Sequence, residues 1–229
     1  MDLILEYQSQ LIAGTLMTIK LALASLAIAL VFGLLGAWAK LSSNRLAQRL
    51  AGAYTTVVRG IPDLVLILLV FFGGQVTLNY AGYATGLWDY AEISQFAAGA
   101  GTIGVIFGAY FTETFRGAIM AIPRGQIEAG VSIGMRPSLV FRHIIWPQMV
   151  RYALPGFTNN WLVQLKTTAL VSVIGLQDLV YNAFTAGRST GQLFTFMAAA
   201  FVIYLLLTGV SDLALRALDR RYSRGVARA

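Results

Sequence analysis

Residues 21–39 read LALASLAIALVFGLLGAWA, an apolar stretch without a charged side chain. A helix rises about 1.5 Å per residue, so about 20 such residues cross the hydrocarbon core of a bilayer. The whole composition agrees, because 57% of the 229 residues are hydrophobic and only 12% are charged. Soluble domains carry roughly twice that share of charge. We therefore expect residues 21–39, extended upstream past Lys20, to form a transmembrane helix.

Four further apolar stretches follow, and Lys166 is the only charged residue in them. They cover residues 64–87, 93–112, 152–177 and 189–211. Five spans predict an all-α fold, a polytopic membrane helix bundle that forms a single domain over residues 1–229. Asp2 and Glu6 stand where a signal peptide has basic residues, so we expect the first span to be retained.

The connections between these stretches alternate in charge. Basic residues gather in the first connection, the third connection and the tail: Lys40, Arg45, Arg49, Arg59, Arg124, Arg136, Arg142, Arg151, Arg216, Arg220, Arg221, Arg224 and Arg228. The N-terminus and the connection with Asp89 and Glu92 have none, and the fourth connection holds Asp178 and a single Arg188. Basic connections stay cytoplasmic, which predicts the N-terminus outside and the C-terminus inside. We attribute the net charge of +7 to this topology and not to nucleic-acid binding.

The residues of most catalytic sites are missing from this sequence. It has no cysteine and a single histidine, His143, which argues against thiolate chemistry, a histidine metal site or a catalytic triad. It also lacks the G-x-x-x-x-G-K phosphate-binding loop, so ATP would be hydrolysed by another subunit. A G-x-S-x-G match at residues 187–191 falls in an expected outer loop, and we attribute it to chance. We expect no enzymatic activity and no cofactor bound by this chain.

Small residues are frequent in the first and third spans. Gly104 and Gly108 form a G-x-x-x-G pair, and Gly33 and Gly36 lie in the first span. Small residues let helix backbones approach closely where lipid supplies no hydrophobic drive. They serve either packing within the chain or an interface between subunits, and we favour packing.

The connection over residues 123–150 carries the most specific pattern. A short helix is expected to end at Gly134, and a second one to cover residues 139–146, before Pro147 and Pro155 interrupt the chain. The segment carries apolar residues together with several arginines. On the residues alone, this helix pair either docks on a protein partner or rests on lipid as an amphipathic interfacial helix.

This connection resembles the EAA loop of ABC importer permeases, whose pattern is EAA, three residues, Gly, nine residues and then I-x-L-P. The matching residues are Glu128, Ala129, Gly130, Gly134, Ile144, Trp146 and Pro147. Gly130 replaces the usual alanine and Trp146 the usual leucine, while the glutamate, the central glycine and the proline are kept. The resemblance implies a coupling helix that fits into a groove of a cytoplasmic ATPase.

Other motifs resemble the polar amino-acid permeases along nearly the whole chain. They are Arg59-Gly60-Ile61-Pro62, YFTETFRG at residues 110–117, KTTALVS at residues 166–172 and Arg220-Arg221-Tyr222-Ser223. Together they are most similar to the Q-type permease family of histidine/lysine/arginine/ornithine importers, which are type I ABC importer permeases. The resemblance implies import of basic amino acids, with another polar amino acid such as glutamine as the alternative.

The same resemblance implies partners, because five spans are few for a complete translocation path. A second permease subunit, identical or paralogous, would complete the path in the bacterial inner membrane. An ABC ATPase dimer would bind ATP and Mg²⁺, and a periplasmic amino-acid-binding protein would deliver the substrate. An ion-coupled secondary transporter fits less well, since such proteins usually show duplicated halves, and no internal repeat is visible here.

Four polar residues in or beside the spans are candidates for the substrate path: Asp63, Glu113, Asn160 and Lys166. A cationic substrate would favour an acid in the cavity, and ionisable groups within spans are functional by default. Each residue also has a structural alternative. Glu113 would pair with Arg116 one turn away, and Asp63 would face a positive helix start. Lys166 would snorkel or pair with an acid, and Asn160 would satisfy backbone groups.

Overall fold

The computed structural model describes residues 2–222, and every regular element in that range is helical. The expected all-α membrane bundle is thereby confirmed. Ser223, Arg224 and Arg228, which belong to the basic tail and to the C-terminal motif, lie outside the described residues.

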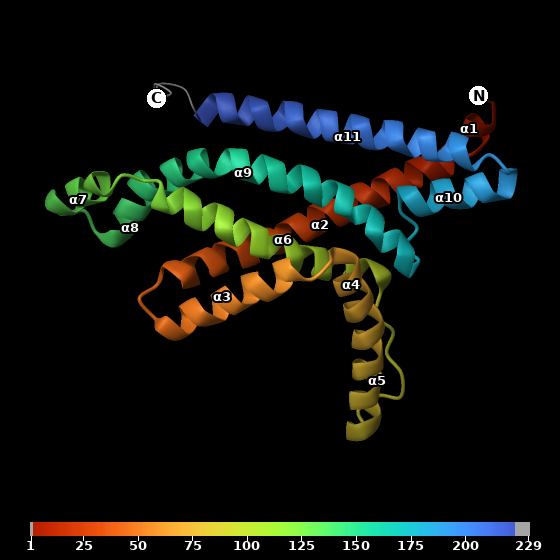
Figure 1. Cartoon of the computed structure of the whole chain (residues 1–229), viewed down its shortest axis with the longest axis horizontal. Helices are drawn as coiled ribbons and strands as arrows, with labels where there is room; N and C mark the ends of the chain where they lie inside the picture. The colour runs from red at the N-terminus through yellow and green to blue at the C-terminus, as the bar shows by residue number, and fades with distance from the viewer. Residues whose placement is uncertain (1, 223–229) are drawn as a thin grey trace.

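Eleven α-helices make up the described part of the chain (Figure 1). They are α1 (Asp2–Glu6), α2 (Gln8–Leu41), α3 (Arg45–Gly60), α4 (Asp63–Leu68), α5 (Gly74–Thr85), α6 (Gln95–Met120), α7 (Arg124–Ser132), α8 (Pro137–Val140), α9 (Trp146–Thr167), α10 (Leu179–Thr190) and α11 (Leu193–Tyr222). Two π-helical turns, Leu69–Gly73 and Phe141–Ile145, join α4 to α5 and α8 to α9. A 3₁₀ segment, Thr168–Ile174, extends α9.

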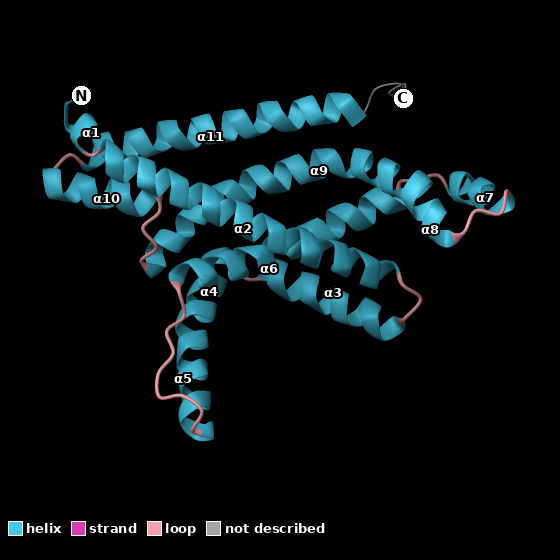
Figure 2. Ribbon diagram, turned by 180° about the vertical axis from the view of Figure 1, so that it is seen from behind, coloured by secondary structure: helices cyan, strands magenta, loops and turns pink. Residues whose placement is uncertain are grey.

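The long helices α2, α6, α9 and α11 lie side by side and form the body of the bundle (Figure 1). Helices α7 and α8 lie at one end, together with the last turn of α11, whereas α1 and α10 lie at the other end. Seen from behind, α4 and α5 extend away from the body, with an irregular strap running back beside α5 (Figure 2). The two ends of the bundle therefore differ in the elements that they present.

Three segments are long and apolar enough to cross a bilayer: α2, α11 and Asp63–Thr85. Two bent pairs qualify only when each pair is counted as one span. One joins α6 to α7 with a bend of 64°, and the other joins Pro137–Ile174 to α10 with a bend of 52°. The described residues thus hold three to five spans, and the five expected from the sequence are the upper value. The third span also runs further than expected, because α6 continues to Met120 and includes Glu113.

Two connections that the sequence analysis treated as loops are helices. The first contains α3, a strongly amphipathic helix. Asn44 caps its start, and the Asn44 side chain accepts hydrogen bonds from two backbone N–H groups. The fourth contains α10, which Asp178 caps in the same way. Residues 187–191 lie at the end of α10, where Gly191 is left-handed, and not in an outer loop as expected. Short helices with mixed faces escape a search for long apolar runs.

Pro147 and Pro155 do not interrupt the chain as expected. Pro147 is the second residue of α9 and follows directly on the π-helical turn Phe141–Ile145, with which α9 is continuous. Pro155 lies inside α9, and the helix continues past it to Thr167. Membrane helices tolerate internal proline because neighbouring groups re-satisfy the freed carbonyl. The second short helix therefore does not stop at Trp146 but runs on, through a π-helical turn, into the fourth span.

Helices α2 and α6 pack very closely because glycines line their contact. A Cβ built on Gly33 would lie 2.6 Å from the Phe111 Cβ, and one built on Gly104 would lie 2.5 Å from the Ile28 Cγ2. Gly108 meets Phe32 in the same way. The G-x-x-x-G pair thus serves packing within the chain, as we favoured from the sequence.

Candidate functional site

The helix pair at residues 123–150 forms a compact hairpin, called here the coupling hairpin, made of α7, α8 and the π-helical turn Phe141–Ile145. Its first helix, α7, ends at Ser132, and Gly134 follows two residues later with a φ of +80°. The Gly134 N–H donates to the Val131 carbonyl at 2.9 Å, and the Met135 N–H donates to the Gly130 carbonyl at 3.1 Å. These two bonds close a Schellman motif, which favours glycine at the left-handed position. The helix stop expected at Gly134 is therefore present.

Packing and hydrogen bonds hold the two arms of the hairpin together. Gly130 is buried, and a Cβ built on it would lie 2.5 Å from the Ile144 Cδ1. The Gln148 amide, on the first turn of α9, donates to the Gln126 side-chain oxygen of α7 at 2.6 Å and to the Ile144 carbonyl at 2.9 Å. The hairpin is therefore a preformed unit and not a loose connection.

The outer surface of the hairpin offers groups to a partner. Glu128 and Ala129 are exposed on α7, and Val131 and Ile133 expose apolar side chains beside them, with Ile133 79% exposed. Trp146 and Pro147, at the start of α9, are also exposed. The ring centroids of Trp146 and Phe141 are 6.1 Å apart. Apolar side chains next to a lone carboxylate at the tip of a bundle form a surface suited to contact with another protein.

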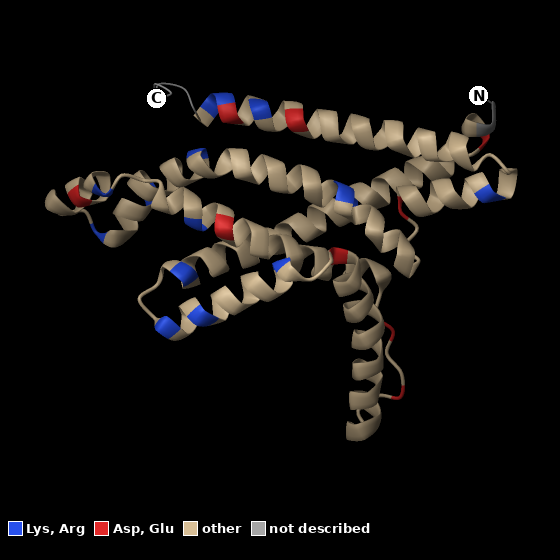
Figure 3. Ribbon diagram, viewed as in Figure 1, with Lys and Arg blue, Asp and Glu red and all other residues tan. Residues whose placement is uncertain are grey.

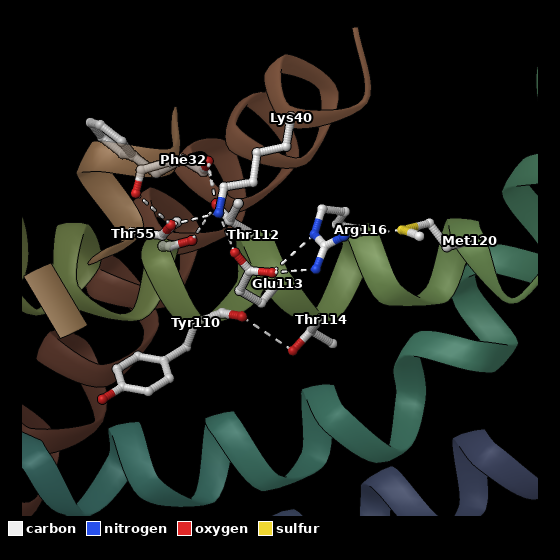
Figure 4. A network of polar contacts seen from close by, with 11 residues as sticks. Phe32, Lys40, Thr55, Tyr110, Thr112, Glu113, Thr114, Arg116 and Met120 are labelled. Carbon is white, nitrogen blue, oxygen red and sulfur yellow. Dashed lines mark hydrogen bonds and ion pairs between the residues drawn. The ribbon is translucent and has the colours of Figure 1, made fainter. Parts of the chain in front are cut away.

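A polar network joins α2, α3 and α6 close to the hairpin (Figure 4). The Lys40 ammonium, from the last turn of α2, donates to the Glu113 Oε1 and also to the Thr55 Oγ1 of α3, the latter at 2.6 Å. Arg116 approaches Glu113 from the other side, with its Nε and Nη2 each 3.0 Å from the Oε2. We call these four residues the charge clamp. Both oxygens of the Glu113 carboxylate are therefore occupied by cations of the protein itself.

The neighbouring residue Thr114 links α6 to α9. Its Oγ1 accepts a hydrogen bond from the Asn160 Nδ2 at 3.0 Å. The helices come close here because Gly156 has no side chain, and a Cβ there would lie 2.8 Å from the Thr114 Cγ2. Asn160 is buried. Its side chain donates to the Thr114 side chain, whereas the structural alternative expected it to satisfy backbone groups at a helix start.

The remaining two candidates stand apart from this network. Asp63 is the first residue of α4 and is partly buried, and Lys166 is exposed near the end of α9. No hydrogen bond or ion pair between described residues joins either side chain to Glu113 or Asn160. The structure thus brings Glu113 and Asn160 together through Thr114 and leaves Asp63 and Lys166 outside that group.

Sequence reasoning missed several residues of the network. Lys40 was counted only as a basic residue of a connection, and Thr55 was not considered. Buried polar contacts elsewhere were missed too, including the Gln164 amide that donates to the Ser25 hydroxyl at 2.9 Å. The one available signal was the spacing of Lys40 one turn after Gly36, on the face that packs against α6.

Charge also distinguishes the two ends of the bundle (Figure 3). Lysine and arginine gather at the end that holds the hairpin, the start of α3 and the last turns of α11. Figure 3 shows far fewer basic residues at the end with α1 and α10.

Comparison with known proteins gives consistent matches. The family model described as "Binding-protein-dependent transport system inner membrane component" matches residues 29–224. The histidine/lysine/arginine/ornithine transport system permease protein HisQ of Escherichia coli (strain K12) is 50% identical over 97% of both chains. The octopine transport system permease protein OccQ of Rhizobium radiobacter is 44% identical over 95% of this chain and 92% of its own.

A solved structure, described as the crystal structure of an amino acid ABC transporter with histidines, is also similar. It superposes with a TM-score of 0.81 at 32% identity, and the match covers 95% of this chain and 96% of that one. The similarity in sequence and in fold therefore spans nearly the whole molecule.

Proposed function

The chain belongs to the family of binding-protein-dependent transport system inner membrane components, and from this membership we propose that it is the permease subunit of an ATP-driven importer for basic amino acids. The observation that carries the proposal is the 50% identity with HisQ over 97% of both chains. Arginine, ornithine, lysine and histidine are the substrates that this similarity favours. A permease for another polar amino acid, such as glutamine, is the alternative.

The coupling hairpin is the part that would receive the work of ATP hydrolysis. Its exposed residues Glu128 and Ala129 would sit in a groove of a cytoplasmic ABC ATPase, with Ile133 beside them. The Gly130 and Ile144 contact keeps the two arms at a fixed spacing, so the hairpin would move as one body. ATP and Mg²⁺ would be bound by the ATPase dimer and not by this chain.

The orientation in the membrane follows from the charge at the two ends. Basic residues favour the cytoplasmic side, so the hairpin end would face the cytoplasm and α1 would face the periplasm. The substrate would arrive at the α1 end from a periplasmic binding protein. In this orientation the N-terminus would lie outside and the C-terminus inside.

The substrate path would form between this chain and a second permease, identical or paralogous. Asp63 is the acid that we assign to the cationic group of the substrate, because its carboxylate has no cation of the described chain within ion-pair distance. Asn160 and Lys166 remain candidates for lining the path. Closure of the ATPases would rock the helices about the path and expose it to the two sides in turn.

The test is ATP hydrolysis by the intact complex in lipid vesicles, with the binding protein present. Arginine, lysine, histidine and ornithine should stimulate hydrolysis and be taken up, whereas glutamine should do neither. If glutamine alone stimulated hydrolysis, the chain would be a permease for another polar amino acid and not for basic amino acids. Hydrolysis that no amino acid stimulates would argue against an amino-acid importer altogether.

A further inference from the structure

The charge clamp lies beside one of the close contacts between α2 and α6. Gly36 faces Thr112 with no room for a side chain, and Lys40 follows Gly36 by one helical turn while Glu113 follows Thr112 directly. The close crossing therefore delivers the Lys40 ammonium to the Glu113 carboxylate (Figure 4). Thr112 is itself held in place, since its hydroxyl donates to the Gly108 carbonyl at 2.8 Å.

The carboxylate in this clamp is unsuited to binding a cationic substrate. Lys40 occupies one of its oxygens and Arg116 the other, so a substrate guanidinium or ammonium would have to displace a cation that is already paired. The two cations outnumber the single acid, which leaves the cluster with a positive charge. The side chains of Lys40 and Glu113 are only 16% and 25% exposed, so solvent and salt screen the pair less than a surface pair.

The clamp stands between the coupling hairpin and the substrate-path candidate Asp63. On one side, α6 runs from Glu113 to Met120, and the buried Ile122 then anchors the start of the hairpin in the core. On the other side, Lys40 reaches Thr55 on α3, and α3 leads within a few residues to α4 and Asp63. Thr55 is buried, and it is the only described residue of α3 that forms a hydrogen bond with Lys40.

We propose that Glu113 and Lys40 are positioning residues, and that their ion pair carries the displacement of the coupling hairpin from α6 to α2 and α3, and so to the substrate path. This inference rests on the proposed function. It removes Glu113 from the substrate ligands expected from the sequence and gives it a role in coupling. It also predicts that the clamp affects transport of every substrate equally.

The experiment uses the complete complex in vesicles, with the binding protein present. The variants are Glu113→Gln, Lys40→Met, their double variant and Thr55→Val, which keeps the ion pair and the side-chain volume but removes the link to α3. The matched control is Asp212→Asn, because Asp212 and Arg216 form an ion pair of 2.7 Å within α11, at the same end of the bundle. Basal hydrolysis, stimulated hydrolysis, uptake and KM are measured for each.

The clamp variants should assemble and keep their basal hydrolysis. Their substrate-stimulated hydrolysis and uptake should fall roughly fivefold or more, the smallest effect typical of a lost coupling between two sites. KM should stay unchanged for arginine and for histidine alike, and Asp212→Asn should behave as the unmodified complex. The double variant should transport no more slowly than the more impaired of its two single variants, because Glu113→Gln and Lys40→Met remove the same interaction.

Two results would overturn the proposal. A lower yield of complex with normal uptake per hydrolysed ATP would make the clamp a stabilising contact only. A rise in KM restricted to cationic substrates in Glu113→Gln would make Glu113 a substrate ligand. Failure of the unmodified complex to respond to any amino acid would instead refute the proposed function, so the two failures are distinguishable.

Discussion

Gly130 on α7 lies directly against Ile144 in the π-helical turn before α9, so close that a Cβ on the glycine would come within 2.5 Å of the Ile144 Cδ1. Met135 and Val140 close the other sides of the same contact at 3.4 and 3.5 Å. Two positions of the EAA-like motif that lie 14 residues apart in the sequence thus meet in space. The 14-residue separation between Gly130 and Ile144 therefore brings the two arms of the hairpin into contact.

Replacing Gly130 by leucine should therefore open the hairpin. The larger side chain cannot enter the contact with Ile144, and overpacking of this kind costs about 1–3 kcal/mol. We expect the Gly130→Leu permease to insert in the membrane but to lose the ATPase on co-purification. Gly130→Ala is the control, because the nearest atom is the far end of the flexible Ile144 side chain and can move away. Equal ATPase recovery from both variants would contradict a closed hairpin.

The crossing of α2 and α6 should tolerate no side chain at Gly104. A Cβ there would lie 2.6 Å from the Ile28 Cβ, which is fixed to the backbone of α2 and cannot swing away. Gly104→Val should lower the thermal unfolding temperature of the purified chain, since overpacking costs about 1–3 kcal/mol. Gly117→Ala on the same helix, where a Cβ meets nothing within 4 Å, should leave it unchanged or raise it. A Gly104→Val chain as stable as Gly117→Ala would refute this crossing.

The carboxylate of Asp63 should determine selectivity for charged substrates. In Asp63→Asn, the KM for arginine should rise about tenfold or more, because a hydrogen bond to a charged group contributes about 1.5–3 kcal/mol. The KM for a neutral amino acid, where one is transported, should change much less. The measurement is uptake of labelled substrates into vesicles at several concentrations. Loss of both substrates to the same degree would assign Asp63 to the structure of the α4 start.

The topology should be readable with reporter fusions. Fusions after Ser43, between α2 and α3, and after Arg220 should report a cytoplasmic location, because both lie at the basic end of the bundle. A fusion near Asp89, in the strap beside α5, should report a periplasmic location. A cytoplasmic signal at Asp89 would remove the second span and with it the five-span arrangement.

Features set by local chemistry were predictable from the sequence. A helix that ends in glycine favours the left-handed Schellman position, so Gly134 and the end of α7 followed directly from the residues. The apolar runs gave the long helices, because burial in lipid demands about 20 apolar residues. Resemblance to the EAA pattern identified the hairpin itself, which composition alone left undecided between a protein partner and lipid.

Features set by distant contacts were not predictable in the same way. The pairing of Lys40 with Glu113 joins residues 73 positions apart, and the spacing of Lys40 from Gly36 does not identify Glu113 as its partner. Helix α10 is short and carries Arg188, so it resembled a loop until its packing against α2 and α11 was seen. Pro155 remained inside a helix because neighbouring helices can compensate in the membrane, which a single chain segment does not reveal.

The central claim, that the coupling hairpin docks on an ATPase, is tested most directly by photo-crosslinking. A photoreactive residue is placed at the exposed Ala129 on α7, and a second one at Leu213 on α11, which is 69% exposed, as the control. The account predicts that the Ala129 probe yields a covalent adduct with the ATPase subunit in intact membranes, and that the Leu213 probe yields none. Lipid adducts alone from the Ala129 probe would show a helix that only rests on the bilayer, and would contradict the claim.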